Sequence, residues 1–351
     1  MARPHSAMRS IAAIAVALVA AALVFLQQLD ASINERSSAP AGTRIQVSAG
    51  ASLRSVLAEL SRVHAVRRPR QVEWYLRLHG QHLRAQVGSY ELAEGATAQA
   101  ILDQLNAGQV LLSKLTIVEG WTFAQMRAAL NASANLAHEW QHLDDAALMR
   151  ALGQAGLPAE GRFFPDTYRF AAGTSDRRIY ELALQRMRER LRQEWETRAA
   201  ALSVTSADAA LILASIVEKE TAREDERPQV AAVFGNRLHI GMRLQSDPTV
   251  IYGLGARFDG NLRRRDLEAD GPYNSYTRGG LPPTPIALPG GASIHAVLHP
   301  VASKALYFVA TGVGDGSHHF SATYAEHVAA LRQFLKRTGA VPDAAITGGA
   351  K

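Results

Sequence analysis

Hydrophobic positions along the chain begin with an unbroken apolar run and then take up the periodicities of short strands and amphipathic helices. The run extends from Ile11 to Leu26, and Arg3 and Arg9 precede it. A membrane-spanning helix needs about 20 apolar residues, so the polar residues that flank the run have to lie at the two interfaces. No small-x-small cleavage motif follows, which favours an uncleaved anchor over a cleaved signal peptide. Because the arginines lie on the short N-terminal side, we expect the rest of the chain outside the cytoplasm.

A pattern of short strand, glycine turn and helix then recurs three times. The copies cover residues 45–60, 90–105 and 115–130. In each copy a hydroxyl residue two positions after the turn glycine can cap the helix, and these residues are Ser52, Thr97 and Thr122. The copies predict small α+β units, and three imperfect copies are too few for a solenoid.

Helical periodicity dominates the middle of the chain. An apolar stripe from Tyr180 to Trp195 predicts a long amphipathic helix, and Pro228 fits the start of another. Residues 244–291 are rich in Gly, Pro and Tyr and predict ordered loops and short strands, which commonly carry binding groups. Residues 305–312 predict a strand, which a turn and a last helix follow.

The most unusual helix is predicted over Ala210 to Ala222, and it is apolar nearly all round until its last turn. At about 100° per residue, Glu218 shares a face with small residues, whereas Glu220 points to the opposite side. Partial burial and the negative end of the helix dipole disfavour an ionised carboxylate, which suits Glu218 to the role of a general acid. The alternative is that both acids form the solvated end of a core helix.

Composition excludes several kinds of chemistry. A chain of 351 residues with 47% hydrophobic and 20% charged residues is a folded protein of roughly two domains. The net charge of +6 suits an anionic partner such as a phospholipid surface, nucleic acid or an acidic polymer. The lack of cysteine excludes disulfides, thiolate zinc sites and cysteine nucleophiles. His295 and His299 precede Pro300, and His318 and His319 are adjacent, so we expect no metal site.

Residues that suit a sugar ligand cluster in the predicted loops. Amide and phenol groups with exposed aromatic faces fit a polyhydroxylated ligand. The candidate substrate-binding residues are Gln245, Asp247, Tyr252, Tyr273, Asn274 and Tyr276. A glycoside hydrolase needs a second carboxylate besides Glu218, and Asp247 and Asp166 are the available candidates.

Ordered motifs also run through most of the chain. They are VEGWT, GRFFPDTYRFAAGTSD, LASIVEKETA, VFGNRLHIGMRLQSDPTVIYG, YNSYTRGGLPPTPIALPG, LHP, LYFVATG and HHFSATYAEH. Together they resemble the endolytic murein transglycosylase family, also called YceG-like, over roughly residues 45 to 337. The family's proline loop more often reads GLPPGPI with Asn near its end, whereas Thr284 and Leu288 occupy those positions here.

The resemblance implies cleavage within peptidoglycan strands, between N-acetylmuramic acid and N-acetylglucosamine, leaving a 1,6-anhydro end without the use of water. Glu218 matches the family's catalytic glutamate, which protonates the glycosidic oxygen and then takes the proton of the C6 hydroxyl as that oxygen attacks C1. No cofactor is implied. The alternatives are a water-using glycoside hydrolase and a non-catalytic envelope protein that binds glycan.

We therefore expect an α+β protein with an N-terminal membrane anchor, a small LysM-like α+β domain and a larger mixed α/β catalytic domain. The expected divisions are a cytoplasmic tip and anchor (1–28), a linker (29–43), the LysM-like domain (44–112), the catalytic domain (113–337) and a disordered tail (338–351). The expected location is the cytoplasmic membrane, crossed once, with the catalytic domain in the periplasm or otherwise outside the cytoplasm. The expected partners are glycan strands, the membrane and, from the resemblance, peptidoglycan synthases; nucleic acid is not expected.

Overall fold

The computed structural model describes residues 4–48 and 50–339 and divides the chain into two units. Unit 1 comprises Met1–Lys114, Asn135–Ala137 and Arg169–Thr174, and unit 2 comprises Leu115–Ala134, His138–Tyr168 and Ser175–Lys351. Helices predominate, and the described strands form two-stranded sheets. The expected mixture of helices and strands is thus confirmed. Of the tail expected to be disordered, residues 340–351 lie outside the described residues.

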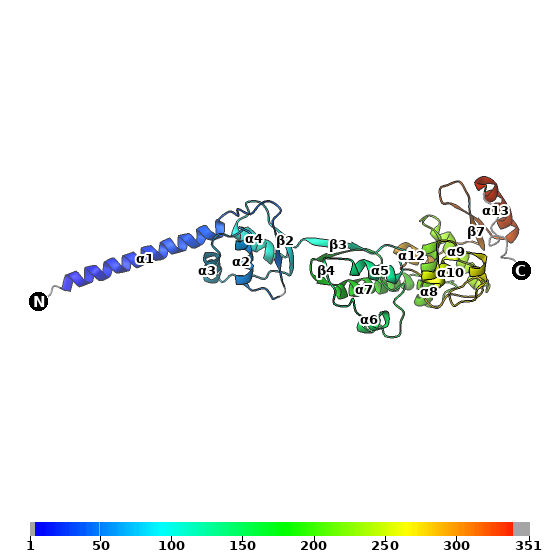
Figure 1. The fold of residues 1–351 in the computed structure, drawn as a ribbon, viewed down its shortest axis with the longest axis horizontal. Coiled ribbons are helices and arrows are strands. Elements are labelled where there is room, and N and C mark those ends of the chain that lie inside the picture. The colour runs from blue at the N-terminus through cyan, green and yellow to red at the C-terminus, as the bar shows by residue number, and fades with distance from the viewer. Residues whose placement is uncertain (1–3, 49, 340–351) are drawn as a thin grey trace. The chain divides into compact units, whose positions relative to one another are not determined.

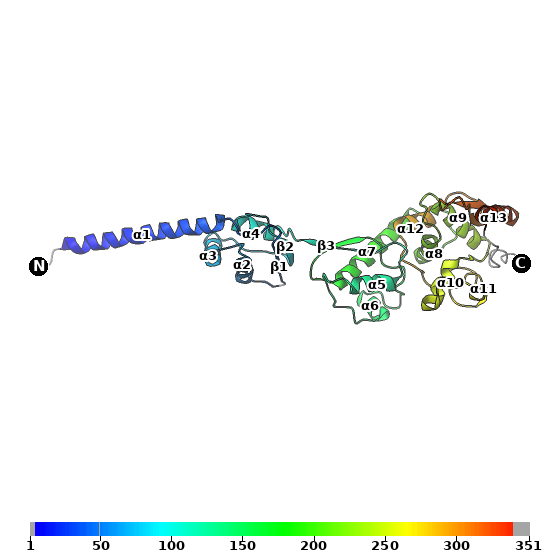
Figure 2. The ribbon, with the colours of Figure 1, turned by 45° about the horizontal axis from the view of Figure 1, so that its top comes forward.

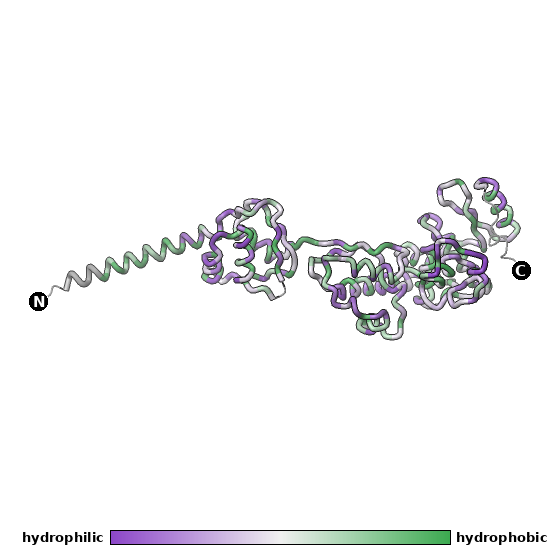
Figure 3. The backbone as a smooth tube through the Cα atoms, in the orientation of Figure 1, coloured by the Kyte–Doolittle hydropathy of each residue, from purple (hydrophilic) through white to green (hydrophobic). Residues whose placement is uncertain are grey.

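Helix α1 (Pro4–Asn34) carries the apolar run of unit 1 (Figure 1). Its segment Ile11–Asn34 is long and apolar enough to cross a membrane, and Figure 3 shows the apolar colour along it. The last turns of α1 are buried, unlike the exposed apolar segment before them. Leu29 and Ile33 are only 1% exposed where α1 contacts α3 (Pro69–Leu78). The end of α1 therefore belongs to the core of unit 1, although a linker was expected from residue 29.

The rest of unit 1 is built on the antiparallel pair β1 (Arg44–Val47) and β2 (Gly88–Glu91). Helices α2 (Leu53–Arg62) and α3 lie between these strands in the sequence, and α4 (Ala98–Asn106) follows them. Apolar side chains of the strands and helices form one core. Its most buried members include Ile45, Leu57, Leu60, Val72, Tyr90, Ile101 and Leu105.

The three sequence copies have the predicted local structure. Each begins with a strand, namely β1, β2 or β3 (Leu112–Thr116), and continues into α2, α4 or α5 (Phe123–Asn131). The side chains of Ser52, Thr97 and Thr122 each accept a hydrogen bond from the backbone N–H three residues later. Gly120, the turn glycine of the third copy, has φ +76°, a conformation that other residues rarely adopt. The predicted helix caps are confirmed.

The remaining elements follow in chain order. They are β4 (Leu136–Ala137), α6 (Asp145–Ala151), β5 (Thr167–Ala171), β6 (Thr174–Ser175), α7 (Asp176–Glu196), α8 (Ala207–Glu220), α9 (Arg227–His239), α10 (Asp247–Leu254), the 3-10 turn η1 (Gly255–Arg257), α11 (Arg264–Glu268), α12 (Gly291–Leu298), β7 (Tyr307–Ala310), β8 (His318–Ser321) and α13 (Tyr324–Thr338).

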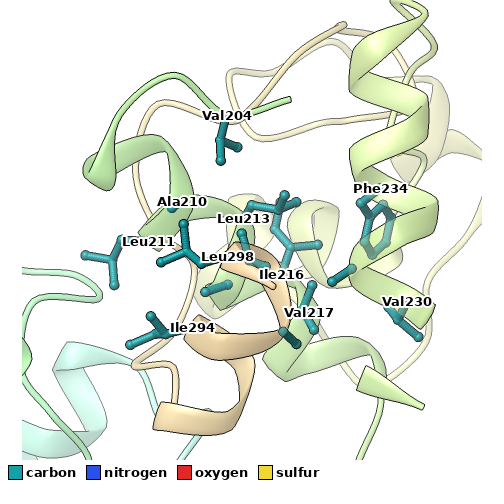
Figure 4. Close-up of a cluster of buried hydrophobic side chains, with 14 of the residues drawn as sticks. Val204, Ala210, Leu211, Leu213, Ile216, Val217, Val230, Phe234, Ile294 and Leu298 are labelled. Carbon is teal, nitrogen blue, oxygen red and sulfur yellow. The ribbon is translucent and has the colours of Figure 1, made fainter. Parts of the chain in front are cut away.

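Helix α8 is the centre of unit 2. It contacts α7, α9, α10 and α12, and Figure 4 shows its apolar side chains between α9 and α12. Leu211, Leu213, Ile216 and Val217 are at most 2% exposed. Because α8 has neighbours on several sides, its nearly all-round apolar sequence is buried, and the prediction of a core helix is confirmed.

Residues 244–291 differ from their prediction. Instead of short strands they form α10 and α11, which Figure 2 shows in yellow, and the described part of this segment contains no strand. Pro248 lies in the first turn of α10, where a missing backbone N–H costs nothing. The strand expected over 305–312 is confirmed as β7, which pairs with β8 where a turn was expected.

Candidate active site

Glu218 lies in the last turn of α8, and its side chain is 6% exposed. Its Oε2 accepts two hydrogen bonds, from the backbone N–H of Gly290 at 2.9 Å and from the hydroxyl of Ser293 at 2.7 Å. Both donors lie at the N-terminal end of α12. Oε1 is 4.0 Å from Nη2 of Arg227. The two oxygens of this carboxylate are therefore unequal, and Oε1 is the one left available for proton exchange.

Arg227 begins α9 and is 7% exposed. Its guanidinium makes only loose ion pairs, at 4.0 Å to Glu218 and 4.0 Å to Glu224. Its Nε is buried and has no hydrogen-bond partner among the described residues. Buried guanidinium donors in proteins normally have partners, so an unpaired donor beside Glu218 is unusual.

A second carboxylate that the sequence did not single out, Glu119, lies next to this site. A Cβ atom placed on Gly290 would stand 2.0 Å from Oε1 of Glu119, so that carboxylate covers Gly290 directly. Partial burial raises the pKa of Glu119, the negative charge of Glu218 raises it further, and Arg227 opposes the shift. Glu119 and Glu218 thus interact electrostatically across one glycine.

Backbone hydrogen bonds bring these two acids together. The N–H of Gly120 donates to the carbonyl of Leu288 at 2.9 Å, and the N–H of Leu288 donates to the carbonyl of Trp121 at 2.6 Å. The ammonium of Lys219 also donates to the carbonyl of Gly120, at 3.3 Å. In the sequence Glu119 stands in the VEGWT motif, just before the turn glycine of the third copy, which gives no hint of its distant partner.

A groove of about 1330 Å³ in unit 2 contains part of the predicted sugar-binding set. Tyr252 and Tyr273 line it with ring centroids 4.9 Å apart, and Lys219, the neighbour of Glu218, lines it too. Such a volume exceeds the roughly 300–1,000 Å³ of ordinary small-molecule pockets. The groove has the size and aromatic lining that a chain of sugar rings requires.

Glu160 is a further acid of the groove, and it is 9% exposed. Its carboxyl accepts hydrogen bonds from the backbone N–H of Phe123 at 2.9 Å and from the hydroxyl of Tyr252 at 3.1 Å. Burial outweighs these bonds and raises the pKa of Glu160 to about 7. Glu160 therefore fixes the position of the Tyr252 ring in the groove.

The other predicted binding residues lie in different surroundings. The hydroxyl of Tyr276 donates to Asp247 at 2.5 Å, and Gln245 has φ +50°, which is rare outside glycine. Asn274 is 5% exposed, and its amide donates to the carbonyls of three residues in and just after α11, so it holds that loop together. Tyr252 and Tyr273 are thus the two members of the predicted set that line the groove.

The remaining acids are engaged away from Glu218. Glu220 accepts a hydrogen bond from Ser246, and burial raises the pKa of Glu220 to about 7. Asp166, proposed as a second acid for a hydrolase, forms an ion pair with Arg186. Asp247, the other candidate for that role, accepts a hydrogen bond from Tyr276. In the described part of the chain neither Asp166 nor Asp247 forms a hydrogen bond or an ion pair with Glu218.

The family model described as the YceG-like family matches residues 45–333. This chain belongs to the YceG-like family. A Bacillus subtilis (strain 168) protein named endolytic murein transglycosylase is 29% identical over 310 residues, which cover 83% of this chain and 84% of that protein. A protein of the same name from Streptococcus pneumoniae (strain D39) is 28% identical over 277 residues, but these are 68% of this chain and only 49% of that protein.

A solved structure is also similar to this YceG-like chain. The crystal structure of a yceG-like protein from Listeria monocytogenes superposes with a TM-score of 0.52 at 28% identity. The match covers 82% of this chain and 98% of that one. The resemblance found in the sequence motifs is therefore confirmed at the level of the family and of the fold.

Proposed function

We propose that this YceG-like protein is an endolytic murein transglycosylase that cuts peptidoglycan strands between N-acetylmuramic acid and N-acetylglucosamine and leaves 1,6-anhydro ends. The Bacillus and Streptococcus relatives carry that name. The observation that carries the proposal in this chain is the Glu218 carboxyl, which two donors hold by Oε2 while Oε1 remains available. A single oriented carboxyl suffices when the nucleophile belongs to the substrate.

In the proposed reaction, protonated Glu218 gives its proton to the glycosidic oxygen as the C1–O bond breaks. The carboxylate that results accepts the proton of the C6 hydroxyl of the same muramic acid residue. As it loses this proton, the C6 oxygen bonds to C1, which closes the 1,6-anhydro ring and leaves Glu218 protonated as at the start. Ser293 and Gly290 keep the carboxyl in one orientation throughout, because both bonds fall on the oxygen that does not exchange the proton.

Two neighbours support these steps. Partial burial and the negative charge of Glu218 raise the pKa of Glu119, so Glu119 keeps its proton to higher pH than an isolated glutamate and adds less negative charge beside the site. The guanidinium of Arg227, whose Nη2 is 4.0 Å from Oε1 of Glu218, stabilises the carboxylate that forms when Glu218 gives up its proton. Glycan strands occupy the groove, where the faces of Tyr252 and Tyr273 contact sugar rings.

We also propose where the protein is located and which function each domain has. The apolar part of α1 anchors the protein in the cytoplasmic membrane, and both units lie outside the cytoplasm, in the periplasm. Residues 44–112 act as a LysM-like glycan-binding domain and residues 113–337 as the catalytic domain. What supports this division is the separate core of the first unit. Peptidoglycan synthases, whose nascent strands the enzyme cuts, are the proposed partners.

Product analysis tests the reaction. Purified protein digests intact peptidoglycan, and mass spectrometry identifies the new ends, with Glu218→Gln and Glu139→Gln, at an exposed position of unit 2 outside the groove, as a matched pair. We expect anhydro ends from the wild type and Glu139→Gln. Loss of the general acid should slow Glu218→Gln by about 100-fold or more, with binding to strands retained. Reducing ends would instead identify a hydrolase, and full activity in Glu218→Gln would remove this residue from the mechanism.

Labelling of single cysteines tests the topology, because the chain has none of its own. We expect a membrane-impermeant maleimide to label the exposed positions of Glu94→Cys and Gln333→Cys in intact spheroplasts. Ser6→Cys, on the N-terminal side of the apolar run, should react only after the membrane is permeabilised. The reverse pattern would place both units in the cytoplasm.

A further inference from the structure

A group of three metal-binding side chains lies where α7 contacts α12. It consists of Glu194 from the last turn of α7, His295 from α12 and His299, which caps the end of α12. Their ligand atoms all lie within 4.8 Å of one another. Nδ1 of His295 is 2.8 Å from Oε2 of Glu194, and Nε2 of His299 is 3.3 Å from the same oxygen.

The sequence predicted no metal site at these histidines because Pro300 follows them. In the structure α12 extends to Leu298, and His299 has φ −133° and ψ 56°, a conformation outside the helical region as a residue before proline prefers. The proline therefore ends the helix only after both histidines are in place. Residues four apart share one face of a helix, and the two imidazoles stack with centroids 4.4 Å apart.

Hydrogen bonding within the group is incomplete. His295 and Glu194 have a good hydrogen bond, but Nε2 of His299 is buried and has no hydrogen-bond partner in the described part of the chain. It approaches the carboxylate closely without making a hydrogen bond. A buried polar atom without a hydrogen-bond partner lowers the stability of the folded state. Here Nε2 of His299 faces a carboxylate oxygen that is already hydrogen-bonded to His295.

We propose that Glu194, His295 and His299 bind a transition-metal ion of the Zn²⁺ type. Two imidazole nitrogens and one carboxylate oxygen are a ligand set that Zn²⁺ uses, and two histidines four apart on a helix are a common way to supply it. The fourth position falls to water, because the His295 side chain is 56% exposed and the site is open on that side. The ion would fill the unmet bonding capacity of His299.

Arg190 supports the geometry of this site. Its Nη2 forms an ion pair with Oε1 of Glu194 at 2.9 Å, whereas Oε2 of the same carboxylate lies next to the imidazoles. Residues that contact a metal ligand, and not the metal itself, commonly orient that ligand. The positive charge of Arg190 opposes the cation, so affinity below that of a purely histidine and carboxylate site is expected.

The consequence of the ion concerns α12. This helix supplies Ser293 to Glu218, and at its start a Cβ placed on Gly291 would stand 3.3 Å from the guanidinium of Arg190. An ion bound by α7 and α12 together would fix the helix that holds the proposed catalytic carboxyl. The ion would stabilise the contact between α7 and α12 and would take no part in the proposed reaction.

Metal binding by the full chain in detergent, without an affinity tag, tests the proposal. Zn²⁺ alone is titrated by calorimetry, and Co²⁺ gives a visible spectrum that reports the ligand geometry. We expect one Zn²⁺ per chain, with neither Mg²⁺ nor Ca²⁺ competing. The thermal midpoint should rise with Zn²⁺, since the ion binds the folded state.

Variants decide between this site and the other histidines of the chain. His295→Ala changes a largely exposed side chain, so it should fold and lose at least tenfold in Zn²⁺ affinity. Glu194→Gln should weaken binding as well, whereas His138→Ala, outside the group, should not. Unchanged binding in His295→Ala, or no Zn²⁺ binding by the wild type, would overturn the proposal. Neither outcome depends on the lytic activity.

Discussion

At the scale of single residues, the site is organised around Gly290. Its N–H holds Glu218, and its missing side chain leaves room for Glu119. A glycine is therefore needed here for close approach and not for its backbone angle, since φ is −74°. Two acids and one buried arginine meet at this point, which makes the protonation of the pair the property most open to test.

Removing the charge of Glu218 should change the titration of Glu119. Burial raises the pKa of Glu119 and the charge of Glu218 raises it further, so the pKa of Glu119 should fall in Glu218→Gln. Carboxyl NMR of Glu119 across the pH range measures this pKa, and Glu139→Gln, at an exposed position of unit 2, should leave it unchanged. An unshifted titration of Glu119 in Glu218→Gln would mean that the two acids are not coupled.

Adding one methyl group at Gly290 should disturb both acids at once. In Gly290→Ala the new Cβ would meet Oε1 of Glu119 at 2.0 Å, so the acid or the backbone has to move. We expect kcat to fall by about tenfold or more, since one misplaced donor at a charged transition state costs that much. Gly279→Ala is the control, because a Cβ there meets nothing within 4 Å. Equal kcat values for the two variants would contradict this packing.

At the scale of elements, the sequence predicted what depends on local chemistry. Ser52, Thr97 and Thr122 cap their helices as predicted, because a cap involves only neighbouring residues. The strands expected in 244–291 are instead α10 and α11, since tertiary packing overrode a weak local preference. Glu119 was missed for the same reason: its partners come from segments distant in the sequence, and no local pattern encodes that meeting.

One buried acid at the start of α5, Glu160, should make the stability of the protein depend on pH. Glu160 accepts the N–H of Phe123, the first residue of α5. Its pKa is raised from 4.5 to about 7, so between these pH values the folded state binds more protons than the unfolded state. The stabilisation is complete below pH 4.5 and is lost as the pH rises through 7. Relative to Glu160→Gln, the wild type should lose on the order of 3 kcal/mol of unfolding free energy over this range.

Denaturant unfolding of both proteins at several pH values measures this difference. Glu220 has a pKa raised in the same direction and adds a dependence of the same sign, but it is common to both proteins and cancels. Tryptophan fluorescence follows unit 2, which contains Trp121, Trp140 and Trp195. A constant difference between wild type and Glu160→Gln from pH 4 to pH 8 would contradict a raised pKa.

At the scale of the whole molecule, α1 combines two physical roles in one helix. Its apolar stretch is exposed and can enter a bilayer, whereas its last turns are buried in unit 1. The sequence predicted the first role from an apolar run. It did not predict the second, because Leu29 and Ile33 are isolated apolar residues in a polar stretch, and only their contact with α3 explains them. The proposed anchor and the first domain are thus parts of one folded structure.

Two truncations separate these roles. A chain that starts at Gln27 lacks the apolar run but keeps Leu29 and Ile33, so it should leave the membrane fraction and unfold like the full chain. A chain that starts at Glu35 also loses both side chains, and unit 1 should be destabilised by about 3–6 kcal/mol, because each buried side chain of this size contributes about 1.5–3 kcal/mol. Trp74 in α3, kept as the single tryptophan, reports unit 1 by fluorescence. Identical unfolding of the two truncated chains would show that the end of α1 contributes nothing to this core.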